Sequence, residues 1–217
     1  MLNFRSSSLA GFLTVLLLAV ASSPAFSSTL LDDFFIAVRN GNDGEVKIWL
    51  AKGVDVNALD QRGETPLMMA VRSDDHPLVV SALLEGGAKS YLRNPHGETA
   101  LMLAAFHGRD KSVAALLERG TDIGEANRMG WTPLIYAAFA GHAAIAAQLL
   151  AYGAPADSAA GNGMTALMLA ARNGHIAMVE LLLAKGADRS LKNSAGTDAR
   201  QLALSAGNTQ IAELLKP

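Results

Sequence analysis

The sequence repeats with a period of about 33 residues, and this restricts the fold more than any other feature. Five glycines mark successive units at steps of 34, 33, 33 and 33 residues: Gly63, Gly97, Gly130, Gly163 and Gly196. The first four open the pattern Gly-x-Thr-(Pro/Ala)-Leu-x-x-Ala, and a second glycine ends each unit. Periods of 20 to 50 residues are typical of solenoids. The chain is therefore expected to form a stack of similar units.

Each unit reads as a turn followed by two short helices. A threonine can cap the first helix, and a proline such as Pro66 or Pro133 fits its first position. The capping threonines are Thr65, Thr99, Thr132 and Thr165. Gly108, Gly141 and Gly174 then predict the end of that helix, because glycine accepts a left-handed backbone. Helices this short are unstable alone in water, so the units must cover their apolar faces by stacking.

The signatures "TPLM", "TALM", "TPLI" and "TALM", with the exit "GVDVNA", resemble those of ankyrin repeats over about residues 29–217. The resemblance implies an all-α solenoid of stacked helix-turn-helix units with protruding turns. About six repeats are expected, two of them caps: 29–59, 60–93, 94–126, 127–159, 160–192 and 193–217. The family's signature histidine, which bonds neighbouring units, is replaced throughout by Met68, Met102, Ile135 and Met168. We expect this loss to change how the stack is held together.

The terminal units depart from the pattern as caps should. Asp32 and Asp33 stand where Thr-Pro would, and Asp198 and Arg200 occupy the threonine and leucine positions of the last unit. Polar residues suit an outer face without a neighbour. The segment 72–80 holds the one-residue insertion behind the 34-residue step, so a bulged loop is expected there.

Residues 1–27 have the layout of a secretory signal peptide. Arg5 precedes 13 uncharged, mostly apolar residues (9–21), and small residues at Ala25 and Ser27 favour cleavage after Ser27. An uncleaved anchor is the alternative, but a membrane span needs about 20 apolar residues. The mature domain, 28–217, would carry a net charge of −3. Because it lacks cysteine, it needs no oxidative folding, which suits the bacterial periplasm.

Composition and motifs exclude several functions. A net charge of −2 gives no basic field for nucleic acid or an anionic membrane. The five histidines have no ligand spacing, and no serine lies on a Gly-x-Ser-x-Gly elbow. Methionines at repeated positions indicate packing rather than metal binding. We therefore expect no catalytic residue, metal, cofactor or small-molecule substrate.

Binding residues are sought where the units differ. The resemblance implies a concave groove formed by the turns and the first helices, which binds partner proteins. The candidates there are Phe106, His107, Met129, Trp131, Phe139 and Met164, with the arginines Arg72, Arg128 and Arg172. Tryptophan and arginine are enriched at interface hot spots. We expect the three rings to lie close together with arginines at the margins, although the rings could instead only pack between adjacent turns.

These observations predict an exported, monomeric solenoid that binds another protein and is not an enzyme. An inhibitor or immunity protein that blocks a toxin or enzyme would use the same surface, and so would a secreted effector. An enzyme is the rival from another class, but no constellation of acid, base or nucleophile supports it.

The signal peptide leads to the first prediction. Protein isolated from a periplasmic fraction should begin near Ser28, because the charged region, apolar run and small residues follow in the order that signal peptidases require. N-terminal sequencing of the purified protein tests this. An intact 1–27 segment in the membrane pellet would contradict it.

Overall fold

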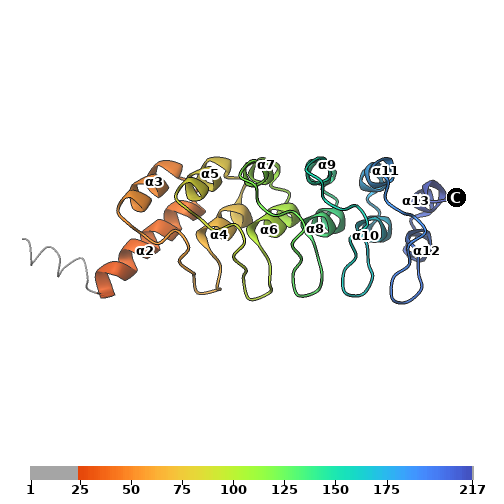
Figure 1. The fold of residues 1–217 in the computed structure, drawn as a ribbon, viewed down its shortest axis with the longest axis horizontal. Coiled ribbons are helices and arrows are strands. Elements are labelled where there is room, and N and C mark those ends of the chain that lie inside the picture. The colour runs from red at the N-terminus through yellow and green to blue at the C-terminus, as the bar shows by residue number, and fades with distance from the viewer. Residues whose placement is uncertain (1–23, 217) are drawn as a thin grey trace, which may run out of the picture.

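Pairs of short helices, stacked in two layers, make up residues 24–216, the part of the chain that the computed structural model describes (Figure 1). The first helices of the pairs form one layer: α2 (Pro24–Arg39), α4 (Pro66–Ser73), α6 (Ala100–His107), α8 (Pro133–Ala140), α10 (Ala166–Asn173) and α12 (Ala199–Ser205). The second helices form the other: α3 (Asp43–Ala51), α5 (Pro77–Glu85), α7 (Asp110–Glu118), α9 (Ala143–Ala151), α11 (Ile176–Ala184) and α13 (Thr209–Leu214). Within this range the β-structure is limited to one isolated bridge, between Ala159 and Thr165. The predicted all-α solenoid is confirmed.

The threonines start the first helices as the sequence predicts. In all four inner units the threonine hydroxyl accepts a hydrogen bond from the backbone N–H three residues later, at 3.3 to 3.4 Å. The residues that replace the signature histidine, such as Met68 and Ile135, supply this N–H while their side chains are fully buried. The substitution thus places apolar volume in the core.

Hydrogen bonds from side chains of the next unit connect neighbouring units in the stack. His142 and His175 each donate a ring N–H to the carbonyl at the end of the preceding unit's first helix, Phe106 and Phe139 respectively, both at 3.1 Å. A carbonyl oxygen can only accept, so the Nε2 atom must carry the proton. At the same position of the last unit, Asn208 donates to two carbonyls of α10 at 2.9 Å. These bonds cap helix ends across the unit boundary.

The one-residue insertion lies between α4 and α5, as predicted, and it has a structural role. Gly108, Gly141 and Gly174 end the other inner helices in the left-handed conformation, whereas α4 ends at Asp74 in extended backbone. The lengthened loop carries Asp75 to the start of α7 in the next unit. There its carboxylate accepts bonds from the backbone N–H groups of Lys111 and Ser112, at 3.1 and 2.9 Å, and from the Ser112 hydroxyl at 2.7 Å.

The turns that precede the first helices project from one side of the stack (Figure 1), and we call them fingers. They span 60–64, 94–98, 127–131, 160–164 and 193–197. A carboxylate or carboxamide oxygen at the base of four fingers accepts two backbone N–H groups of its own turn; these residues are Asp60, Asn94, Asn127 and Asn193. The finger at 160–164 has Ala160 there. It is bonded instead to its neighbours, through Gly161 N–H to Met129 O at 2.8 Å and Ser194 N–H to Asn162 O at 3.0 Å.

The first unit differs from the predicted cap. Asp32 and Asp33 do not start the helix but lie exposed inside α2, which begins nine residues before Asp33. The described residues include no finger before this helix, and its residues 31–39 line a cavity beside the first finger. Of the predicted signal peptide, residues 1–23 lie outside the described residues, and the cleavage point after Ser27 falls within α2. Among the helices described, none is long and apolar enough to cross a membrane.

Asp75 provides the second prediction. Replacing it with Ala removes a side-chain cap from α7 and should lower the free energy of unfolding by about 0.5–2 kcal/mol. Urea denaturation followed by circular dichroism measures this. Asp74→Ala is the matched control, since Asp74 is exposed in the same loop and caps no helix of the next unit among the described residues. Equal stabilities of the two variants would contradict the assigned role.

Candidate binding surface

One position of the first helix distinguishes the units along the face that the fingers border, which we call the inner face. Counted two residues before the glycine that ends the helix, or at the equivalent place in α4, the row runs Arg39, Arg72, Phe106, Phe139, Arg172 and Ser205. Since the repeat frame accepts a guanidinium, a ring or a hydroxyl here, it does not determine the residue. The middle of the row is aromatic and its flanks are cationic.

Four rings meet at the centre of this row, and we call Phe106, Trp131, Tyr136 and Phe139 the aromatic cluster. The rings of Phe106 and Phe139 are stacked at 21°, with 6.3 Å between their centroids. The Trp131 ring lies 5.3 Å from that of Phe139 and 5.2 Å from that of Tyr136. Tyr136 completes the cluster with an edge contact to Phe106 at 5.9 Å. The structure therefore brings together the three rings selected from the sequence.

The cluster combines packing with accessibility. Tyr136 is buried, Trp131 and Phe139 are half-buried, and Phe106 is 37% exposed. Next to them on the finger, Met129 is 60% exposed. Thus the rings support one another, as the packing alternative expects, and still present apolar surface to solvent.

A network of hydrogen bonds holds Tyr136, the buried member of the aromatic cluster, in position. Tyr136 donates its hydroxyl proton to Glu98 at 2.6 Å and accepts a bond from the Asn127 side-chain amide at 2.8 Å. The second oxygen of Glu98 accepts a bond from Asn94 at 2.8 Å. Burial, followed by the hydrogen bond and charge of Glu98, raises the pKa of Tyr136 well above its usual range. Tyr136 therefore stays protonated at neutral pH and links two adjacent units.

The charged candidates differ in how available they are. Arg72 is already paired within the protein. Its guanidinium makes two hydrogen bonds to the buried carboxylate of Glu64, one of them 3.1 Å from Nε to Oε2. Arg128 and Arg172 are exposed, and neither forms an ion pair with another described residue. The aromatic centre thus has an exposed guanidinium on its C-terminal side.

His107 lies beside the cluster, with its ring 5.0 Å from that of Phe106. Its pKa is lowered chiefly by burial and further by the charges of Arg72 and Arg109. An imidazole ordinarily titrates near pH 6.5, so this one is neutral at pH 7. Its Nε2 atom is buried without a hydrogen-bond partner among the described residues.

The prediction that Met164 lies on the binding surface is wrong. It is only 5% exposed, and its sulfur accepts a bond from the Asn193 side chain at 3.3 Å. The physical reason is that its side chain turns toward the finger of the next unit, where Asn193 contacts the sulfur. Glu64 at the equivalent position is also buried.

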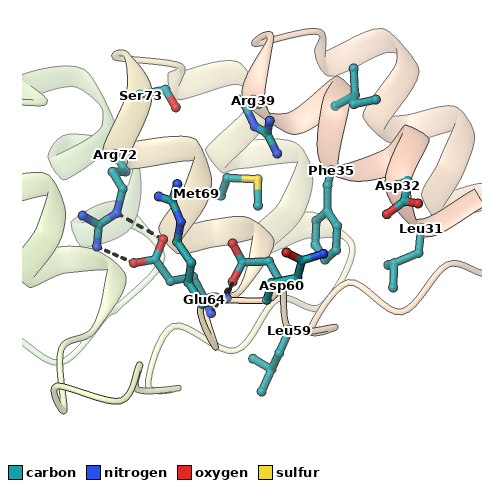
Figure 2. Close-up of a pocket in the computed structure, with 13 residues that line it drawn as sticks. Leu31, Asp32, Phe35, Arg39, Leu59, Asp60, Glu64, Met69, Arg72 and Ser73 are labelled. Atoms are coloured by element: carbon teal, nitrogen blue, oxygen red, sulfur yellow. Dashed lines mark hydrogen bonds and ion pairs between the residues drawn. The ribbon is translucent and has the colours of Figure 1, made fainter. Parts of the chain in front are cut away.

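A cavity of about 690 Å³ at the N-terminal end of the inner face was not foreseen from the sequence. It lies between α2, the first finger and α4 (Figure 2). Phe35 and Met69 form an apolar floor, Leu59 lies across from them, and Arg39 stands at one end. Arg39 could have been found from the sequence, since it is in register with Phe106.

The described residues were also compared with the requirements of a metal site and of nucleophilic catalysis. In residues 24–216, no group of three or more histidine or acidic side chains is placed to hold a metal ion. The buried Nε2 atom of His107 forms no hydrogen bond with a serine or threonine hydroxyl among these residues, as a catalytic base would. The geometry consists of an apolar cluster, exposed guanidinium groups and a cavity, which are features of a binding surface.

Stacked helix pairs with projecting turns define a helical repeat protein of the solenoid class. The family model for ankyrin repeats, in three copies, matches residues 34–127, 119–193 and 150–217. The chain therefore belongs to the ankyrin repeat family. Ankyrin repeats are protein–protein interaction modules, and the family is typically non-enzymatic.

Tyr136 provides the third prediction. Tyr136→Phe keeps the ring but leaves Glu98 and Asn127 without their shared partner, which should cost about 1–3 kcal/mol of unfolding free energy. Urea denaturation measures the change. Tyr152→Phe is the control, because this hydroxyl belongs to an exposed residue and makes no hydrogen bond with a described residue. A loss below about 0.5 kcal/mol for Tyr136→Phe would mean that water replaces the hydroxyl.

Proposed function

We propose that this protein is a non-enzymatic binding protein of the periplasm that holds a partner protein on its inner face. The partner would contact the aromatic cluster together with Met129. The protein acts as a monomer, and no nucleic acid, membrane or small-molecule substrate takes part.

The exposure of the aromatic cluster is the observation that carries this proposal. Flanking units place Arg72 and Arg172 where the centre has Phe106 and Phe139, so stacking alone does not require rings there. Trp131 likewise stands where other inner units have Glu64, Glu98 or Met164. Apolar surface that the frame does not need is costly in water unless a partner covers it. Aromatic side chains are also the most frequent anchors of protein interfaces.

The polar network supports the same conclusion because it prepares the site in advance. The hydrogen bonds of Tyr136 hold the rings at fixed positions before any partner arrives. A partner then loses less conformational entropy at the interface, and more of the contact energy appears as affinity. An inhibitor or immunity protein would use the same device. Loss of activity of the captured protein on binding would place this chain in that narrower class.

Trp131→Ala should weaken partner capture strongly, which is the fourth prediction. Truncating a central aromatic anchor typically costs at least about 2 kcal/mol, or about thirtyfold in affinity. The partner is first captured from periplasmic extract on the immobilised protein and identified by mass spectrometry. Its affinity for the purified variants is then measured by titration calorimetry.

Trp49→Ala is the matched control. Trp49 is the only other tryptophan of the sequence, is also half-buried, and lies on α3 in the second layer, with Lys52 over its ring at 4.0 Å. It should bind the partner with unchanged affinity, and both variants should keep the helix content of the parent. Normal binding by Trp131→Ala together with lost binding by Trp49→Ala would refute the inner face as the site.

A further inference from the structure

Among the described residues, α2 takes the place of a finger at the N-terminal end of the inner face, and a cavity lies beside it. In the inner units, the space beside a finger is filled by the finger of the preceding unit: Pro95 lies against Gly63, and Arg128 against Gly97. On its N-terminal side, the first finger faces α2 among the described residues. A straight helix fills this space less completely than a folded turn would, and a cavity of about 690 Å³ is left (Figure 2). Such a volume is within the range of ligand pockets.

The cavity exposes apolar surface at its rim. Leu59 is 58% exposed and Ile36 is 48% exposed, whereas Phe35 and Met69 beneath them are buried. Two large aliphatic side chains therefore face water around an apolar floor. A bulky apolar side chain from a partner would cover both of them and fill space that the fold leaves empty.

The charged groups that line the cavity differ in whether they already have partners within the protein. Of its carboxylates, Glu64 is neutralised by Arg72, and Asp60 accepts two backbone N–H groups of the finger at 2.8 Å. Asp32 remains exposed, but it lies seven residues from Arg39 along α2, a rise of about 10 Å. Figure 2 shows Arg39 and Asp32 at separate places on the cavity wall. The Arg39 end therefore presents a guanidinium group that has no ion-pair partner among the described residues.

Exposed arginines without an ion-pair partner occur at several places on the inner face. Arg39 and Arg62 line the cavity, are exposed, and form no ion pair with another described residue. Arg128 lies on the finger that carries Trp131 of the aromatic cluster, and Arg172 lies beyond the cluster. These four exposed guanidinium groups lie on one face of a protein whose net charge is −2. Such a contrast favours a partner of opposite charge.

We propose that the inner face takes an acidic segment of the partner protein, which places a bulky apolar side chain in the cavity beside α2 and carboxylates against Arg39 and Arg62. This rests on the proposed function and specifies the chemistry of the partner. The apolar side chain covers Leu59 and Ile36, and the planar guanidinium groups pair with carboxylates. Arg128, beside the aromatic cluster, and Arg172, beyond it, meet further acidic residues.

A polypeptide of known composition tests this without the natural partner. Fluorescein-labelled poly(Glu,Tyr), a random copolymer that is acidic and aromatic, should bind the purified protein in an anisotropy titration, more weakly at high salt. The cationic copolymer poly(Lys,Tyr) should not bind. The double variant Arg39→Glu/Arg62→Glu should lower the affinity for poly(Glu,Tyr) at least about tenfold.

Two matched controls separate the local effect from the total charge. Lys185→Glu/Lys192→Glu changes the net charge by the same amount at exposed positions far along the chain, and it should bind almost as the parent does. Leu59→Gln should weaken binding severalfold, whereas Leu78→Gln, at a leucine 66% exposed on α5, should not. These leucine variants keep the charge constant.

Several outcomes would overturn the proposal. Equal losses in the two double variants would mean that only the total charge matters. Equally tight binding of single-stranded oligodeoxythymidine would show an unspecific anion surface instead of one for acidic polypeptide. If the natural partner is lost on Trp131→Ala but retained by Arg39→Glu/Arg62→Glu, the proposed function stands and the cavity is not part of the site.

Discussion

Helices of eight or nine residues are not stable alone in water, and those of the inner units have these lengths. They persist because each apolar face is covered by the next pair, so contact between neighbouring units determines whether any unit folds. Fully buried residues such as Leu101, Leu116 and Ile145 recur through the stack for this reason. Hydrogen bonds that cross unit boundaries reinforce the contacts. Arg109, for example, donates to carbonyls at the end of α4, one of them Ser73 at 2.8 Å, where the glycine cap is missing.

This dependence on neighbours explains why function is confined to few positions. Residues that face the next unit must keep their volume, whereas the fingers and the exposed ends of the first helices can vary without loosening the stack. In the second unit such positions form an ion pair between Arg72 and Glu64, and in the fourth they bring Trp131 against Phe139. The same backbone geometry thus supports different chemistry from one unit to the next. The inner face gains its character from this variation.

The sequence predicted what local rules control and missed what depends on contacts between units. The threonine caps, the glycine ends and the insertion near Asp75 follow from backbone preferences and were correctly placed. The closeness of Phe106 and Phe139 could be predicted, because equivalent positions in a regular stack are neighbours. The burial of Met164 could not, since it depends on the direction in which one side chain turns. Tyr136 was overlooked because it stands within the apolar frame, and its partners Glu98 and Asn127 lie in different units. The length of α2 was also missed, since no repeat precedes it to set its start.

The backbone bonds between fingers divide the stack into parts of unequal stiffness. They join the finger of Met129 to that of Gly161, and the finger of Asn162 to that of Ser194. In the described part of the chain, no backbone bond joins the finger at 60–64 to that at 94–98, or the latter to that at 127–131. Bending the solenoid toward its inner face must compress or shear the bonded fingers, whereas the N-terminal fingers can move by side-chain adjustment alone. The fingers of the second to fourth units can therefore shift relative to one another more easily than those of the fourth to sixth, and a bound segment that does not match their resting spacing would displace the N-terminal fingers first.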